Sequence, residues 1–154
     1  MEISANKKKK KATMDENLKP IYIWIPGRPS RTTHQSGTKI SGHRTYKTAS
    51  LVSWEHTLQR GLMKHVPDKP IDGPVKLTAT WGFKAPKKSD VGWKLTRPDT
   101  DNMQKTLKDV MTRMNFWEDD SQVVHEVCRK IWTLDPGIYL KIEKLDSEDW
   151  RKEC

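Results

Sequence analysis

Acidic residues gather in one short part of an otherwise basic chain. Asp99 and Asp101 stand one residue apart in the segment RPDTDNMQK, and Asp120 follows in WEDDSQV. Carboxylate oxygens are the ligands that Mg²⁺ prefers, and an ion held by a few carboxylates keeps places for water and substrate phosphate. These residues therefore favour metal-assisted displacement at a phosphate, with Mg²⁺ as the expected metal and Mn²⁺ as the alternative.

Lys105 adds a positive charge at a suitable spacing. It lies four residues after Asp101, one turn further along if the segment is helical. From there its ammonium group could contact the scissile phosphate or offset charge that develops in the transition state. Asn102 and Asp109 share this helix face and are expected to orient the lysine.

Each of these residues also has a simpler structural interpretation. A single aspartate at position 99 or 101 is typical of a helix N-cap, which the helix dipole favours. The pair Asp119 and Asp120 could form an ordinary turn, and Lys105 could be a solvated helix lysine. An EF-hand is a poor fit because the turn glycine and the twelfth-position glutamate are absent. The combination, rather than any one residue, favours the metal site.

The basic residues indicate a polyanionic partner. The chain of 154 residues carries a net charge of +9 and 32% charged residues. The run Lys7 to Lys11 is typical of a solvated tail, whereas two further basic stretches lie inside the expected domain, opposed only by Asp90. The residues expected to hold DNA are Arg28, Arg31, Lys39, Arg44, Lys47, Lys84, Lys87, Lys88, Lys94 and Arg97.

Apolar periodicity predicts a β-α-β-α-β-β order. This is an α+β fold with a mixed or antiparallel sheet packed against two helices. Two long basic loops, 26–47 and 84–97, interrupt the pattern, and the first has room for a short hairpin. The expected elements are strands over 21–25, 75–83, 122–133 and 138–142, and helices from Thr48 or Ser50 to about Val66 and from Thr100 to Met114.

The aromatic residues divide into two groups. Trp24, Trp54 and Trp81, together with Phe116 and Trp117, are expected in the core because they fall within predicted elements or next to them. Trp93 lies in the second basic loop and is a candidate for a DNA wedge or a dimer contact.

Domain organisation follows from composition. We expect a basic tail over 1–19, one domain over 20–146 and a C-terminal tail over 147–154. No stretch approaches the roughly 18 apolar residues that span a bilayer, and the first residues lack the apolar segment of a secretory signal. Cys128 and Cys154 show no metal-site or disulfide spacing, which favours a reducing cytoplasm and no membrane association. The thin core suggests a partner subunit.

The motif segments together resemble a known family. RPDTDNMQK, Asp109 and FWEDDSQVV, with PGRPSRTT and GHRTYKT upstream, resemble the RusA-type Holliday-junction resolvases of bacteria and their phages over about Ile21 to Leu145. The lysine-rich start, the long 84–97 loop and the SEDWRKEC end depart from the family pattern.

The resemblance implies roles for individual residues. Asp99, Asp101 and Asp120 match the carboxylates that bind Mg²⁺, Lys105 matches the catalytic lysine, and Asp119 matches a supporting position. It further implies a homodimer that places two active sites on a four-way DNA junction and makes paired nicks in recombination and repair. Such a protein acts on the nucleoid of a bacterial cell or is encoded by a phage.

Two other functions remain open on the sequence. One is a nuclease of the same chemistry that cuts DNA flaps or replication forks. The other is a non-catalytic DNA-binding module whose basic loops grip phosphates while the aspartates only cap a helix.

Overall fold

The structure is a computed structural model that describes residues 18–153, so nearly all of the expected N-terminal tail lies outside the described residues. The strands are β1 (Ile21–Pro26), β2 (Thr38–Ser41), β3 (Arg44–Lys47), β4 (Val75–Lys84), β5 (Gly92–Trp93), β6 (Val123–Thr133) and β7 (Gly137–Lys144). The α-helices are α1 (His34–Gly37), α2 (Ala49–Leu62), α3 (Thr100–Arg113) and α4 (Trp150–Glu153). Across the described part of the chain, every helix is too short or too polar to cross a bilayer.

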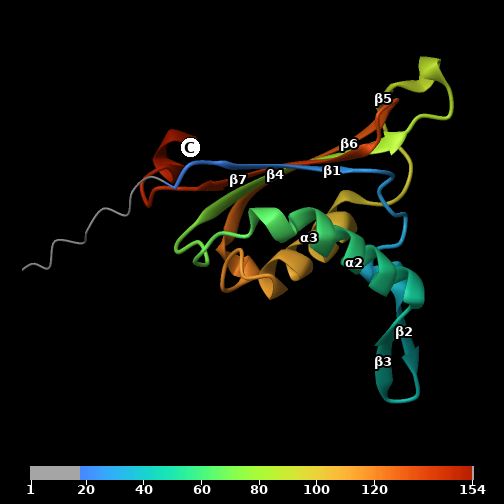
Figure 1. Cartoon of the computed structure of the whole chain (residues 1–154), viewed down its shortest axis with the longest axis horizontal. Coiled ribbons are helices and arrows are strands. Elements are labelled where there is room, and N and C mark those ends of the chain that lie inside the picture. Colours follow the sequence, from blue (N-terminus) through green and yellow to red (C-terminus); the bar gives the residue numbers. More distant parts are fainter. Residues whose placement is uncertain (1–17, 154) are drawn as a thin grey trace, which may run out of the picture.

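One mixed sheet forms the body of the molecule. Its strand order is β1-β7-β4-β6-β5, with β4 and β6 parallel and the other neighbours antiparallel. A parallel pair needs a long crossover connection, and α3 lies in that connection. Helices α2 and α3 lie on the same side of the sheet (Figure 1). The predicted α+β class with a mixed sheet and two main helices is confirmed.

The core lies between the sheet and these two helices. Alternate residues of β4 face the helices, and the apolar stripes of α2 and α3 meet them. The buried side chains of these three elements include Val75, Leu77, Trp81, Phe83, Leu51, Trp54, Leu58, Leu62, Met103, Leu107, Val110 and Met111.

The expected core position of Trp24 is wrong, although Trp54, Trp81, Phe116 and Trp117 are buried as predicted. Trp24 is 46% exposed because β1 turns Ile23 and Ile25 toward the helices. The indole instead covers Gly137 on the open face of the sheet. A Cβ added at Gly137 would lie 2.3 Å from the Trp24 ring, so glycine is needed there.

Two basic elements project from the body. The 26–47 loop contains the hairpin of β2 and β3, as its length suggested, and this hairpin extends well beyond α2 (Figure 1). Its turn includes Gly42 at φ +59°, a backbone conformation that favours glycine. The second element, residues 85–98, includes a 3₁₀ turn at Lys88–Asp90 and the short strand β5, which pairs with the end of β6.

Helix α2 begins as predicted and ends early. The side chain of Thr48 accepts a hydrogen bond from the Leu51 N–H and caps the first turn. The helix ends at Leu62, and a 3₁₀ turn follows at Met63–His65. Gly61 is required by packing, because a Cβ there would lie 2.7 Å from Cγ2 of the buried Ile25.

We predict that Gly61→Ala destabilises the protein although alanine is the better helix former. The added methyl collides with Ile25, which is enclosed by the core, and overpacking of this kind costs about 1–3 kcal/mol against about 1 kcal/mol gained in helix propensity. Denaturant unfolding measures the net loss. Ser53→Ala, at an exposed position of the same helix, is the control and should not destabilise. A more stable Gly61→Ala protein would contradict the packing argument.

Candidate functional site

The aspartate pair lies at the N-terminal end of α3. Asp99 is the N-cap residue, with extended backbone angles, yet its side chain makes no capping hydrogen bond. Asp101 lies in the first helical turn, and both side chains are exposed. The positive end of the helix dipole favours negative charge here. Because the Asp99 carboxylate does not cap the helix, its oxygens are available to a ligand.

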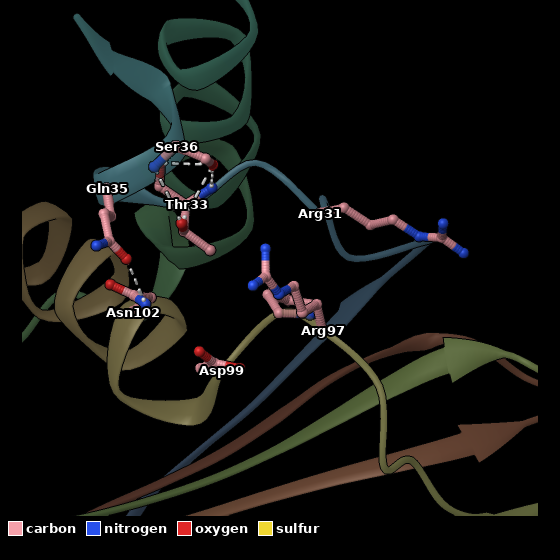
Figure 2. A pocket seen from close by; sticks show the side chains of 8 residues that line it. Arg31, Thr33, Gln35, Ser36, Arg97, Asp99 and Asn102 are labelled. Carbon is pink, nitrogen blue, oxygen red and sulfur yellow. Dashed lines mark hydrogen bonds between the residues drawn. The ribbon is translucent and has the colours of Figure 1, made fainter.

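The first basic loop lies beside Asp99. The amide of Asn102 donates to Gln35 Oε1 at 3.1 Å, and the His34 N–H donates to Thr106 Oγ1 at 3.0 Å, so α1 is docked on α3. Asn102 therefore contacts α1, a partner that the sequence did not predict. A hollow opens between these elements (Figure 2). It is lined by Arg31, Thr33, Gln35, Ser36, Arg97, Pro98, Asp99 and Asn102.

Lys94 is buried, which corrects its expected role in DNA binding. It is 3% exposed and lies over the Phe83 and Trp132 rings, with Nζ 5.1 and 4.4 Å from their centroids. Its ammonium donates to the carbonyls of Thr96 and Arg97. Burial lowers its pKa, and nearby positive charges lower the pKa further. The other expected DNA-binding side chains are exposed.

Two ammonium groups hold the segment that leads into Asp99. Lys94 donates to Thr96 and Arg97, and Lys130 Nζ donates to the carbonyls of Thr96 and Pro98 at 2.8 and 2.9 Å. These contacts tie the start of α3 to β6. The position of the Asp99 carboxylate is therefore set by lysines that do not themselves face the hollow.

A buried amide fixes the rotation of α3 on the sheet. Gln104 accepts a hydrogen bond from Trp81 Nε1 at 3.1 Å and donates to Glu126 Oε1 at 3.0 Å. Lys108 reaches the same carboxylate at 3.2 Å. Asp101 lines a shallow hollow with this group and with Cys128. Burial raises the pKa of the Cys128 thiol to about 12, which leaves it protonated and a poor nucleophile.

Lys105 and Asp109 are neighbours on the exposed side of α3, as their spacing predicted. Lys105 Nζ lies 3.8 Å from Asp109 Oδ1. Asp109 also lines a hollow at the C-terminal end of the helix, where Asp120 lies. Lys105 thus stands along the helix between the aspartate pair and the downstream aspartate.

Asp120 is the first residue of a 3₁₀ turn, Asp120–Gln122. The preceding Asp119 accepts a hydrogen bond from the Ser121 N–H at 2.8 Å and so caps the turn; bonds from Ser121 lower the pKa of Asp119. Gln122 anchors the turn by donating to the carbonyls of Ile71 and Gly73 at 2.9 and 3.0 Å. Asp119 therefore contributes to the shape of the turn, and the half-buried Asp120 carboxylate remains for a ligand.

The structure separates the three aspartates within one chain. Asp99 and Asp101 lie at the start of α3, whereas Asp120 shares a hollow with Arg113 at its end. A helix of 14 residues rises about 1.5 Å per residue, which places its ends on the order of 20 Å apart. Within residues 18–153 of this chain, no three His, Cys, Asp or Glu side chains are grouped closely enough to hold a metal ion.

Glu55 is a site residue that the sequence analysis missed. It is 6% exposed, and its carboxylate contacts Lys47 at the base of the hairpin and Arg113 at the end of α3. Its position in the sequence carried a signal, since it falls on the apolar stripe of α2 between Leu51 and Leu58. A charged residue on a buried stripe requires a partner.

An exposed carboxylate pair at a helix start, an acidic turn beside cations and two projecting basic elements are features typical of proteins that act on nucleic acid. The profile of the family described as Endodeoxyribonuclease RusA matches residues 26–143, and the chain belongs to this family. Over 79 residues it is 37% identical to the crossover junction endodeoxyribonuclease rusA of Lactococcus phage r1t. That alignment covers 49% of this chain and 60% of the phage protein, so the chain spans about three-fifths of that relative.

We predict that Lys94→Met loosens the segment before Asp99 while the domain stays folded. Without the ammonium donors the carbonyls of Thr96 and Arg97 turn to water, and exchange becomes faster at the amides that flank the segment, those of residue 94 and Met103, which bond to the carbonyls of Lys130 and Asp99. Hydrogen-exchange mass spectrometry measures the change. Lys87→Met, an exposed lysine of the same projecting element, should leave the exchange unchanged. Equal protection in both variants would show that Lys94 does not hold this segment.

Proposed function

We propose that the protein is a metal-dependent endodeoxyribonuclease that resolves four-way DNA junctions by paired nicks. The observation that carries this proposal is the exposed carboxylate pair Asp99 and Asp101 at the start of a helix in a chain of the RusA family, where Asp99 occupies the N-cap position without a capping hydrogen bond. The name of the phage relative, a crossover junction endodeoxyribonuclease, supports the same substrate. We infer that it acts in a bacterial cytoplasm on bacterial or phage DNA.

The donor set suits Mg²⁺, with Mn²⁺ as the alternative. Asp99, Asp101 and Asp120 offer only carboxylate oxygens, and each is at least partly accessible to solvent. When bound, the metal supplies an activated water and stabilises the leaving oxygen of the phosphodiester. Lys105, one turn beyond Asp101, is placed to contact the phosphate and offset its charge, with Asp109 at 3.8 Å to orient it.

The complete metal site needs a second subunit. A rigid helix separates Asp120 from the aspartate pair, so we infer a homodimer in which Asp120 of the partner subunit joins Asp99 and Asp101. The body of β6 offers a surface for the second copy: β5 pairs with this edge only at Ile131 and Trp132, and the described structure places no other strand along it. An open edge of this length readily pairs with another chain, and Val124 is exposed there.

The projecting elements suit a branched substrate. The hairpin carries Lys39 and Arg44, and the 85–98 element carries Lys87 and Lys88, all exposed to solvent. Both elements project from the body of the molecule (Figure 1). Basic side chains on two separated projections can follow more than one duplex arm by contacting phosphates. In a dimer these projections are doubled, which fits a substrate with several arms.

A nuclease that acts on flaps or forks has the same site requirements, and only its products differ. The non-catalytic alternative is less well supported, because it assigns Asp99 to capping and the Asp99 side chain makes no capping bond. Symmetric paired nicks on a four-way junction would support resolution, and a single cut on a flap would support the alternative nuclease.

We predict that Asp101→Asn binds a synthetic four-way junction but does not cut it. The substitution keeps the size of the side chain and removes the charge that a divalent cation requires. Gel-shift and cleavage assays in Mg²⁺ should show unchanged or tighter binding and a loss of cutting of at least about a hundredfold, the scale on which a key catalytic group acts. Asp68→Asn, an exposed aspartate that lines none of the hollows of the candidate site, is the control. Cleavage by Asp101→Asn at the wild-type rate would contradict the assignment, and a wild type that binds without cutting any branched DNA would favour the binding module.

We predict that two inactive variants complement each other in a mixed dimer. Asp101→Asn and Asp120→Asn are each inactive as homodimers. A heterodimer of the two keeps one intact site, made of Asp101 from the second chain and Asp120 from the first. Co-expression with different tags and purification through both yields this species, which should nick one strand of a junction. If all three aspartates act within one chain, the heterodimer has no intact site and will be inactive.

A further inference from the structure

The hollow beside Asp120 contains two cations that the catalytic scheme above does not use. Lys47 and Arg113 line it together with Asp109, Thr112, Asp119 and Asp120. Lys47 is the last residue of β3 in the hairpin, and Arg113 is the last residue of α3. Side chains from two distant segments thus meet at the proposed metal ligand.

Glu55 holds both cations from the buried side. Lys47 Nζ donates to its two carboxylate oxygens at 2.8 and 3.0 Å, and Arg113 Nη2 lies 3.2 Å from Oε2. Burial alone raises the pKa of Glu55, but the bonds and charges of Lys47 and Arg113 outweigh it and leave the pKa below its usual value. Glu55 therefore remains charged and ties the hairpin to α3.

The two cations keep donors for another ligand. An arginine has five N–H donors and a lysine three, and Glu55 takes two contacts from Lys47 and one from Arg113, so donors remain on both cations. The side chains of Lys47 and Arg113 are 39% and 45% exposed, so their remaining donors reach solvent at the hollow. A guanidinium next to an ammonium is an arrangement suited to the oxygens of a phosphate group.

We propose that Lys47 and Arg113 form a phosphate-binding subsite that seats a DNA backbone phosphate next to the one that is cut, with Glu55 as the positioning residue. This proposal rests on the proposed function and adds Arg113 and Glu55 to its machinery. The carboxylates of Asp109, Asp119 and Asp120 also face the hollow and repel a phosphate. A divalent cation at Asp120 removes this repulsion, so the subsite binds DNA only in the presence of the metal.

The salt dependence of junction binding tests the subsite. Each phosphate contact contributes about 0.9 to the slope of the logarithm of the binding constant against the logarithm of salt concentration. Measured on the chain with all three aspartates intact, in Ca²⁺ instead of Mg²⁺ so that the carboxylates hold a divalent cation while the junction stays uncut, Lys47→Met and Arg113→Met should each reduce the slope by about one. Arg113→Lys should restore it, and Arg60→Met, an exposed arginine of α2, is the matched control.

Glu55→Gln distinguishes the positioning of Lys47 and Arg113 by Glu55 from their direct contact with the phosphate. The amide still accepts hydrogen bonds and both cations remain, so the salt slope should equal that of the parent. In Mg²⁺, the single-turnover cleavage rate should fall about tenfold, because small displacements of a bound phosphate are costly to catalysis. An unchanged rate would overturn the role of Glu55.

The subsite can be tested even if the Arg113→Met protein does not fold. If Arg113→Met alone unfolds because Glu55 loses a partner, Glu55→Gln with Arg113→Met removes that buried charge and should still lower the slope by about one. Unchanged slopes in Lys47→Met and in the double variant would overturn the subsite and show these cations to be structural. The proposed function fails separately, through a wild type that binds the junction and never cuts it.

Discussion

The placement of the site depends on one buried amide. Gln104 joins Trp81 of β4 to Glu126 of β6, so a single side chain fixes both the height and the rotation of α3 over the parallel strand pair. In an apolar interior these bonds leave α3 few alternative rotations, because any rotation would strand polar atoms without partners. This contact therefore sets the direction of Asp101, Lys105 and Asp109 along α3, whereas the segment that carries Asp99 is also held by Lys94 and Lys130.

Local patterns were sufficient to predict the elements but not the burial of every residue in them. Leu77, Ala79 and Trp81 alternate with polar residues, and α3 shows one apolar stripe, so period alone was decisive. In β1, aromatic residues alternate with isoleucines and both faces are apolar, which left the direction of Trp24 undetermined. The burial of Lys94 depends on rings from β4 and β6, contacts that no local pattern contains.

Local patterns were also insufficient to predict how the candidate site residues lie relative to one another. The types and spacing of Asp99, Asp101 and Asp120 indicated metal chemistry, and the predicted helix had almost its observed bounds. The spacing alone did not show which end of the helix Asp120 would occupy. A turn after Arg113 leads Asp120 to the opposite end, and a rigid rod of this length cannot be shortened to close the gap.

This separation gives the proposed dimer a physical consequence. If each metal site draws carboxylates from two chains, the isolated chain cannot assemble it and cannot damage DNA before pairing. Assembly then creates two sites together, related by symmetry, which is the arrangement needed to cut two strands of one substrate. In such a site the carboxylates of Asp99 and Asp101 repel the Asp120 carboxylate of the second chain until a cation is bound. Binding of the metal therefore favours the dimer, and the neutralised site favours binding of DNA. This coupling between metal binding, dimerisation and DNA binding requires no conformational change within either chain.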